Sequence, residues 1–155
     1  DGKYPFYVRS PKVERINTYS FDGEAILMAG DGVGAGKVFH YAKGKFDYHQ
    51  RVYNFHNFKR AIGKFFFHYI ANNFRYIIEE GGAKNTVDSV RLYMIQNFLM
   101  TVPTIEEQYK ICEYIEQKEM AFDTAISKAQ HQVELLQEYK QSLITEVVTG
   151  KRKVS

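Results

Sequence analysis

The sequence predicts an α+β protein with a front domain of mixed β structure, followed by one long C-terminal helix that forms a coiled coil. Short β-branched and aromatic runs, broken by turn residues, fill most of residues 1–103 together with one helical stretch. An apolar repeat of seven residues then occupies residues 104–150, which is typical of a helix that pairs with another helix. Residues 151–155 form a basic tail.

The first part of the chain is expected to be strands joined by turns. The sequence begins with a turn-like Asp1-Gly2-Lys3 that leads directly into a strand, so we expect the first strands of the domain to lie outside it. Asp22-Gly23 is a typical turn signal between two apolar runs. Strands are predicted over residues 19–21, 25–29, 38–41 and 46–55, the last as one strand or a pair, with turns at 22–23 and 42–45.

The periodicity becomes helical after these strands. A helix is predicted over residues 58–80 and ends at Gly81-Gly82. A loop over 84–87 and a short helix or strand within 90–102 are expected to follow. The helix prediction rests on apolar residues at spacings of three and four, which are Ile62, Phe66, Tyr69, Ile70, Phe74 and Ile77.

The glycine-rich segment 30–37 resembles a nucleotide-binding loop only superficially. A phosphate-binding P-loop requires Gly where this chain has Asp31, and Ser or Thr where it has Val38. A dinucleotide fingerprint requires a helix after the glycines, whereas residues 38–41 predict a strand. We therefore expect a flexible hairpin loop whose backbone can approach another surface, such as a DNA phosphate.

The charge of the chain is unevenly distributed. Residues 1–103 contain 14 Lys and Arg against 9 Asp and Glu, and they hold 20 of the 24 aromatic residues. Residues 104–155 contain 7 basic and 9 acidic residues. A basic front domain favours a polyanionic partner, although such a charge is also common in other proteins. The single cysteine excludes an internal disulfide, which fits a cytoplasmic protein, and no apolar run is long enough to cross a membrane.

The long helix has a clear beginning and end. Thr104 is the predicted N-cap, Glu106 and Glu107 suit the first turn, and Gly150 suits the stop. Lys140 interrupts the apolar repeat, as polar residues that set register in coiled coils do. The residues predicted to pair with a second helix are Ile115, Phe122, Ile126, Ala129, Val133, Leu136, Leu143 and Val147.

No catalytic or metal-binding motif stands out. Cys112 lies on the long helix without the neighbours of a nucleophile, and the five histidines lack metal-ligand spacing. We therefore expect no catalytic residue, no metal and no cofactor bound by this chain.

Several motifs together resemble one family. The most specific are the Pro103-Thr104-Ile105-Glu106-Glu107-Gln108 entry and the exit from Ser142 to Lys151. Supporting segments lie at residues 21–27, 36–39, 44–46 and 49–53. The chain is similar to the specificity (S) subunit of type I restriction-modification enzymes, as one target recognition domain (1–103) plus one spacer helix (104–150). It departs from the family at Ile105, where Pro or Leu is usual, and in having one such unit where a full subunit has two.

The resemblance implies a function and its partners. A recognition domain of this family reads one half of a split sequence in double-stranded DNA, and the paired helices act as a ruler between two such domains. The helices also dock the methyltransferase (M) subunits, which hold S-adenosylmethionine, and the restriction (R) subunit joins that assembly. The S subunit itself is not an enzyme. A chain with one unit pairs either with its own copy or with a missing second half.

Candidate DNA contacts follow from side-chain chemistry. Gln50 and Arg51 suit base edges, since Gln pairs with adenine and Arg with guanine. The candidates for phosphate contacts are Lys37, Lys43, Lys45, Lys84 and Arg91. Asn85 and Thr86 follow Gly81-Gly82 in a predicted loop and suit hydrogen bonds to phosphate or base.

Two other readings remain open from the sequence. The chain is alternatively a coiled-coil scaffold module whose basic domain binds protein, which predicts self-association without salt-dependent DNA affinity. It is also compatible with the C-terminal recognition part of a fused restriction-methylation polypeptide. A nucleotide-using enzyme built on the glycine loop ranks last.

Overall fold

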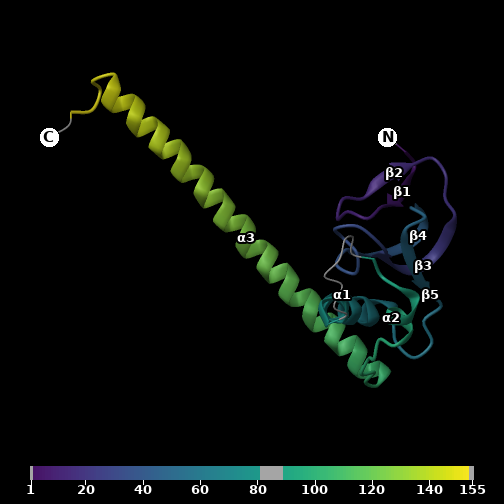
Figure 1. The fold of residues 1–155 in the computed structure, drawn as a ribbon. Helices are drawn as coiled ribbons and strands as arrows, with labels where there is room; N and C mark the ends of the chain where they lie inside the picture. The colour runs from purple at the N-terminus through teal and green to yellow at the C-terminus, as the bar shows by residue number, and fades with distance from the viewer. Residues whose placement is uncertain (1, 81–88, 154–155) are drawn as a thin grey trace. The chain divides into compact units, whose positions relative to one another are not determined.

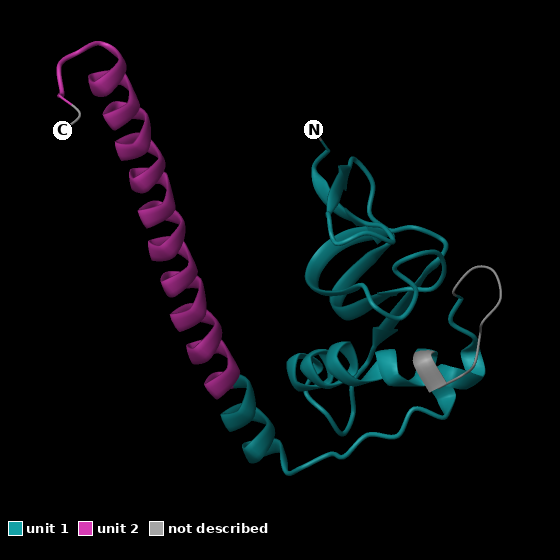
Figure 2. Cartoon of the chain, turned by 60° about the vertical axis from the view of Figure 1, so that its left-hand side comes forward, with its two compact units in different colours: residues 1–112 teal, residues 113–155 magenta. Residues whose placement is uncertain are grey.

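The computed structural model describes residues 2–80 and 89–153 of the chain. Two compact units divide it, a front unit of residues 1–112 and a helix unit of residues 113–155 (Figure 2). This α+β arrangement, with a mixed sheet and a long C-terminal helix, confirms the predicted fold class. The predicted helix end at Gly81-Gly82 and the loop over 84–87 lie outside the described residues.

The front unit is built on a mixed sheet of five strands in the order β2-β1-β4-β3-β5 (Figure 1). All neighbouring pairs are antiparallel except β1 and β4, which are parallel through the Phe6–Asp47 and Tyr7–Tyr48 pairs. The strands are β1 (Tyr4–Tyr7), β2 (Glu14–Ile16), β3 (Phe21–Ala29), β4 (Phe39–Tyr48) and β5 (Val52–His56).

Strand β3 is buried on both faces. Ile26 and Met28 point into a core that α1 (Gly63–Glu80) covers with Ile70 and Phe74. On the opposite face, Ala25 and Leu27 form a second core with residues of the neighbouring strands. These residues are Tyr7 of β1, Ala42, Phe46 and Tyr48 of β4, and Val52 of β5. The run of five buried apolar residues at the end of β3 thus fills both layers of the core.

Two predicted turns are wrong, because the glycines involved face each other across a strand pair. Gly23 lies inside β3 and Gly44 inside β4, and the two are register partners. Their φ angles are 152° and 84°, which residues with a side chain rarely adopt. Glycine here permits an unusual backbone within continuous strands instead of ending them. The chain reverses at residues 49–51, inside the range predicted as strand 46–55.

The helices of the front unit begin later than expected. The 3-4 spacing of apolar residues is realised in α1, but the helix begins at Gly63 and not at residue 58. Asn57, with φ of 60°, directly follows β5, and residues 58–62 before α1 are not helical. A short helix α2 (Leu92–Gln96) occupies the predicted helix-or-strand segment. Strand β2, which is only three residues long, was not predicted.

Helix α3 (Ile105–Val148) has the predicted ends. At its start, Thr104 N–H donates to Glu107 Oε2 (2.9 Å) and Glu107 N–H donates to Thr104 Oγ1 (3.3 Å), which is a reciprocal capping box. The hydrogen bonds from Thr104 hold the pKa of Glu107 below its usual value. At its end, Gly150 adopts a φ of 74°, and Arg152 N–H donates to Glu146 O (3.1 Å).

Candidate nucleic-acid interface

An open pocket of about 420 Å³ lies on the front unit and brings together three of the predicted DNA-contact residues. Gln50 and Arg51 come from the turn between β4 and β5, and Arg91 comes from the residue before α2. The glycine loop contributes Gly30 and Asp31 to the same pocket. Its other lining residues are Val52, Tyr53, Ser89, Val90 and Leu92.

Backbone hydrogen bonds fix the floor of this pocket. Gly30 N–H donates to Arg51 O (2.8 Å), and Val90 N–H donates to Gly30 O (2.8 Å). Tyr53 Oη–H donates to Val90 O (3.0 Å) and connects the segment 89–92 to β5. Because a Cβ on Gly30 would lie 2.8 Å from Arg51 O, only glycine permits this approach. Three distant segments therefore present their side chains from a rigid base.

Asp31 organises two arginines at the rim of the pocket, and the sequence analysis did not select it. Its Oδ1 accepts from Arg9 Nη1 at 2.6 Å, and its Oδ2 lies 3.5 Å from Arg51 Nη1. The hydrogen bond from Arg9 is the main reason why the pKa of Asp31 is lowered. Asp31 is only 19% exposed whereas Arg51 is 63% exposed, so the carboxylate holds an arginine that still faces solvent. The only sequence signal was the position of Asp31 in the glycine loop.

The other predicted lysines lie elsewhere on the front unit. Lys43 and Lys45 are exposed on β4 and do not line the pocket. Lys43 Nζ is 3.7 Å from Glu24 Oε1, and Lys45 lies over the ring of Tyr19 at 4.7 Å from its centroid. Lys37 is exposed at the end of the glycine loop. Lys84, Asn85 and Thr86 lie outside the described residues.

The glycine loop is packed at Ala35 and Gly36, whereas Val33 is 94% exposed, so the exposed loop that the sequence predicts is realised only in part. Gly36 N–H donates to Ala29 O (2.9 Å), and Ala35 and Gly36 are buried. A Cβ on Gly34 would lie 2.4 Å from Arg9 O, so close packing explains this glycine. Strand β4 and not a helix follows the loop, which confirms that it lacks the context of a dinucleotide site.

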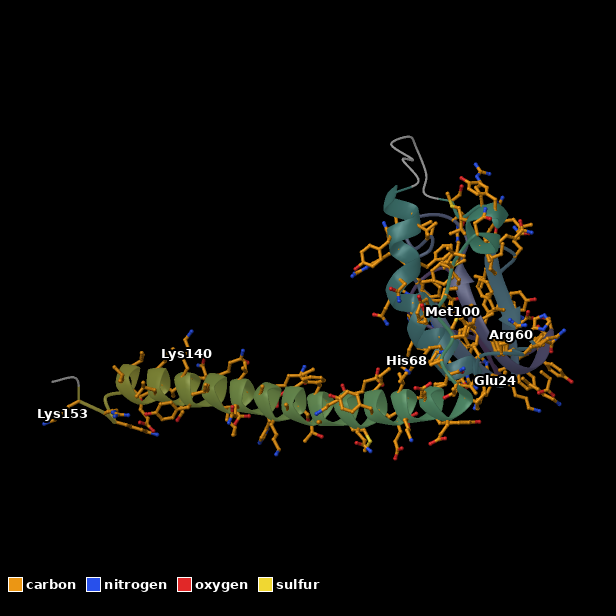
Figure 3. All side chains as sticks on the ribbon, turned by 90° about the horizontal axis from the view of Figure 1, so that it is seen from below. Glu24, Arg60, His68, Met100, Lys140 and Lys153 are labelled. Carbon is orange, nitrogen blue, oxygen red and sulfur yellow. The ribbon has the colours of Figure 1, made fainter. Side chains whose placement is uncertain are left out.

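The helix unit exposes the apolar positions that were predicted to pair with a second helix. Phe122 is 66% exposed and Leu136 is 67% exposed, and Ile126, Ala129 and Val133 are exposed as well. Ile115, Leu143 and Val147 are partly covered. Lys140, labelled in Figure 3, is exposed and lies seven residues after Val133 and seven before Val147. Beyond Cys112, none of the described residues of α3 is buried.

The structure offers no metal site and no membrane span among the residues that it describes. No group of three or more His, Cys, Asp or Glu side chains there is arranged to hold a metal ion. None of the described helices is both long and apolar enough to cross a membrane.

Two comparisons relate this chain to known proteins. A family model described as the type I restriction modification DNA specificity domain matches residues 1–136. The type I restriction enzyme EcoDI specificity subunit of Escherichia coli is 26% identical over 150 residues, which cover 97% of this chain and 33% of that protein. The chain therefore spans about a third of the length of the curated relative it matches.

Proposed function

The chain belongs to the type I restriction-modification DNA specificity family, and we propose from this premise that it reads one half of a split DNA sequence. The convergence of Gln50, Arg51 and Arg91 on one open pocket is the observation that carries the proposal. Glutamine and arginine are the side chains that read adenine and guanine edges in the major groove. The rigid base under the pocket suits a reader, because base contacts tolerate little displacement.

The remaining positive side chains have the role of phosphate contacts. Lys37, Lys43 and Lys45 are exposed, and each retains a charge that can replace a counterion on DNA. Lys84, Asn85 and Thr86 keep the same proposed role from the sequence alone. Such contacts position the domain on the duplex without selecting bases.

The exposed line on α3 is proposed to pair with a second helix, either of another copy or of a second half. An uncovered stripe with Phe122, Val133 and Leu136 on one helix is unfavourable in water. Residues 105–123 of the helix hold six acidic and two basic side chains, and residues 124–148 hold three acidic and two basic ones. The 44 residues of α3 span about 66 Å, the length of about 19 base pairs.

The partners follow from the same premise. We propose that the chain docks methyltransferase subunits, which bind S-adenosylmethionine and transfer the methyl group, and that a restriction subunit joins the complex in the cytoplasm. The chain contributes sequence selection and no catalysis. Its length, about a third of that of the EcoDI subunit, leaves room for a partner half or for a place within a fused polypeptide. Family membership favours these versions over a scaffold module that binds only protein.

Methylation mapping tests the proposal. The chain is co-expressed with a methyltransferase subunit of the same system, and methylated bases in genomic DNA are located one by one. A split motif that is absent from cells with the methyltransferase alone supports the proposal, and a palindromic split motif indicates pairing of two copies. If neither this chain nor its joint expression with a second recognition half produces methylation above that background, the proposed function is wrong.

A further inference from the structure

Gln108 is a fully buried polar side chain at the start of α3, with an exposed fraction of 0%. Burial of an amide is costly unless its donors and acceptor are used, and here they are. Its Oε1 accepts from Ile62 N–H (2.8 Å), and its Nε2 donates to Arg60 O (3.1 Å) and to Pro103 O (2.9 Å). One side chain therefore joins the beginning of α3 to two separate segments of the front unit.

The segment that Gln108 holds is itself fixed to the sheet. Residues 60–62 lead directly into α1, whose first residue Gly63 lies against the carboxyl group of Glu24 on β3. Glu24 in turn accepts a hydrogen bond from the phenol of Tyr41 on β4, and burial is the main cause of the raised pKa of that phenol. Glu24 and Arg60 lie at the same end of the front unit in Figure 3. Gln108 thus connects α3 to a rigid corner of the domain.

A second contact one turn later supports the same attachment. Cys112 is 4% exposed, and it is the last residue of α3 in the front unit. Gln108 and Cys112 lie four residues apart and therefore on one face of the helix. Two points one turn apart fix both the position and the rotation of the first two turns of α3, whereas one point would leave the rotation free.

We propose that Gln108 is the positioning residue that sets the rotation of α3 on the recognition domain, and thereby the spacing that the protein accepts between two half-sites. The proposal rests on the proposed function. One base pair of spacing corresponds to a shift of about 3.4 Å and a rotation of about 35°. A loosened attachment at the start of the helix would let neighbouring spacings be accepted, while the bases read by the pocket stay the same.

The variants separate positioning from a general structural role. Gln108→Leu keeps the volume but loses all three hydrogen bonds, and Gln108→Glu keeps an acceptor for Ile62 N–H while its carboxylate faces two carbonyl oxygens. Gln117→Leu, at an exposed position of the same helix, is the matched control. Circular dichroism and thermal unfolding establish that each variant is folded. If Gln108→Leu is unfolded, the comparison is made with Gln108→Glu.

The first measurement does not depend on DNA. Spin labels are attached at Gln96→Cys and Lys110→Cys, both exposed positions of the front unit, and Cys112 is kept because it is buried and supplies the second contact. Labelled chains are diluted with unlabelled protein so that only distances within one chain are measured. We expect one narrow distance distribution for the parent and for Gln117→Leu, and a broadened distribution for the Gln108 variants. A folded Gln108 variant that keeps the parental distribution overturns the proposal.

The second measurement uses the methylated motif of the complex with methyltransferase subunits. The half-site bases are expected to remain unchanged in the Gln108 variants, while the preference for the parental spacing over one base pair more or less falls about tenfold. If the half-site bases change while the spacing preference stays, the proposal is wrong. Absence of methylation in the parent chain counts against the proposed function and leaves the spin-label distances to decide on the attachment.

Discussion

The front unit and the helix unit use apolar residues in opposite ways. In the front unit, Phe74 and Leu27 are fully buried, and the polar candidates for DNA contact lie at the rim of a pocket. In the helix unit, Phe122 and Leu136 are about two-thirds exposed. The first unit buries its own apolar residues and exposes polar side chains at an open pocket. The second has the composition of half an interface, so its stability depends on what covers it.

The largest expected difference between the units concerns their phenylalanines. Phe74→Ala removes a ring from the closed core and is expected to lower the free energy of unfolding by about 3–5 kcal/mol. Phe122→Ala removes an exposed ring and is expected to cost under about 0.5 kcal/mol in the monomer. Urea unfolding at low protein concentration measures both values. Equal losses at the two sites would contradict the division into a closed and an open unit.

Adjacent leucines on α3 test whether the exposed line is an interface. Leu136→Glu places a charge in the predicted pairing line and is expected to weaken self-association about 100-fold, since two buried leucines per pair contribute about 3 kcal/mol. Leu135→Glu makes the same change one residue away, at a residue that is 51% exposed and outside that line. Analytical ultracentrifugation distinguishes them. A comparable loss in both variants would mean that the predicted line is not the contact surface.

Removal of the Arg51 side chain tests the reading pocket. Arg51→Ala is expected to weaken binding to the specific DNA site by about 1–3 kcal/mol and to relax selectivity at one base position. Lys59→Ala removes one positive charge from an exposed site of the same unit that does not line the pocket, and it serves as the control. Fluorescence anisotropy with a set of single-base variants of the site gives both readouts. Uniform weakening across all sequences would assign Arg51 to phosphate contact instead.

The smallest expected effect concerns the acid response of the pocket rim. The pKa of Asp31 is lower in the folded protein than in the unfolded chain. Its carboxylate therefore stabilises the fold at pH values above the pKa of the unfolded chain, and this contribution is lost as the pH falls through the pKa of the folded protein. Below about pH 4 the free energy of unfolding of the parent is therefore expected to fall slightly more steeply than that of Asp31→Asn, which has no carboxylate to protonate. Thermal unfolding of both proteins between neutral and acid pH gives the comparison. A stability difference that stays constant over that range would contradict a titrating Asp31.

The long elements of the fold could be predicted from the sequence because local patterns determine them. The capping box of Thr104 and Glu107 and the stop at Gly150 are both encoded within a few residues. The turns at 22–23 and 42–45 were wrong because the partnership of Gly23 with Gly44 is visible only when the two strands are paired. Glycine has the same local signature in a turn and in a distorted strand.

The residues of the candidate site could likewise be predicted only where their own chemistry identifies them. Gln50 and Arg51 were selected for their chemistry, and the structure places them with Arg91, which is forty residues away in the sequence. Asp31 and Arg9 were missed because their ion pair joins residues 22 positions apart. Gln108 is recognisable in the sequence only as part of a motif, since its burial and its three hydrogen bonds depend on the packing of the helix start.

The double burial of β3 sets the most protected part of the front unit apart from the residues at the rim of the pocket. Its amide protons are expected to exchange slowest, because Ile26 and Leu27 are shielded on opposite faces and strands flank both edges. The candidate reading residues Gln50 and Arg51 lie outside this strand, on a turn. Substitutions at those two positions therefore need not disturb the buried strand. Under the proposed function, substitutions at the rim change the target sequence while the buried strand keeps its packing.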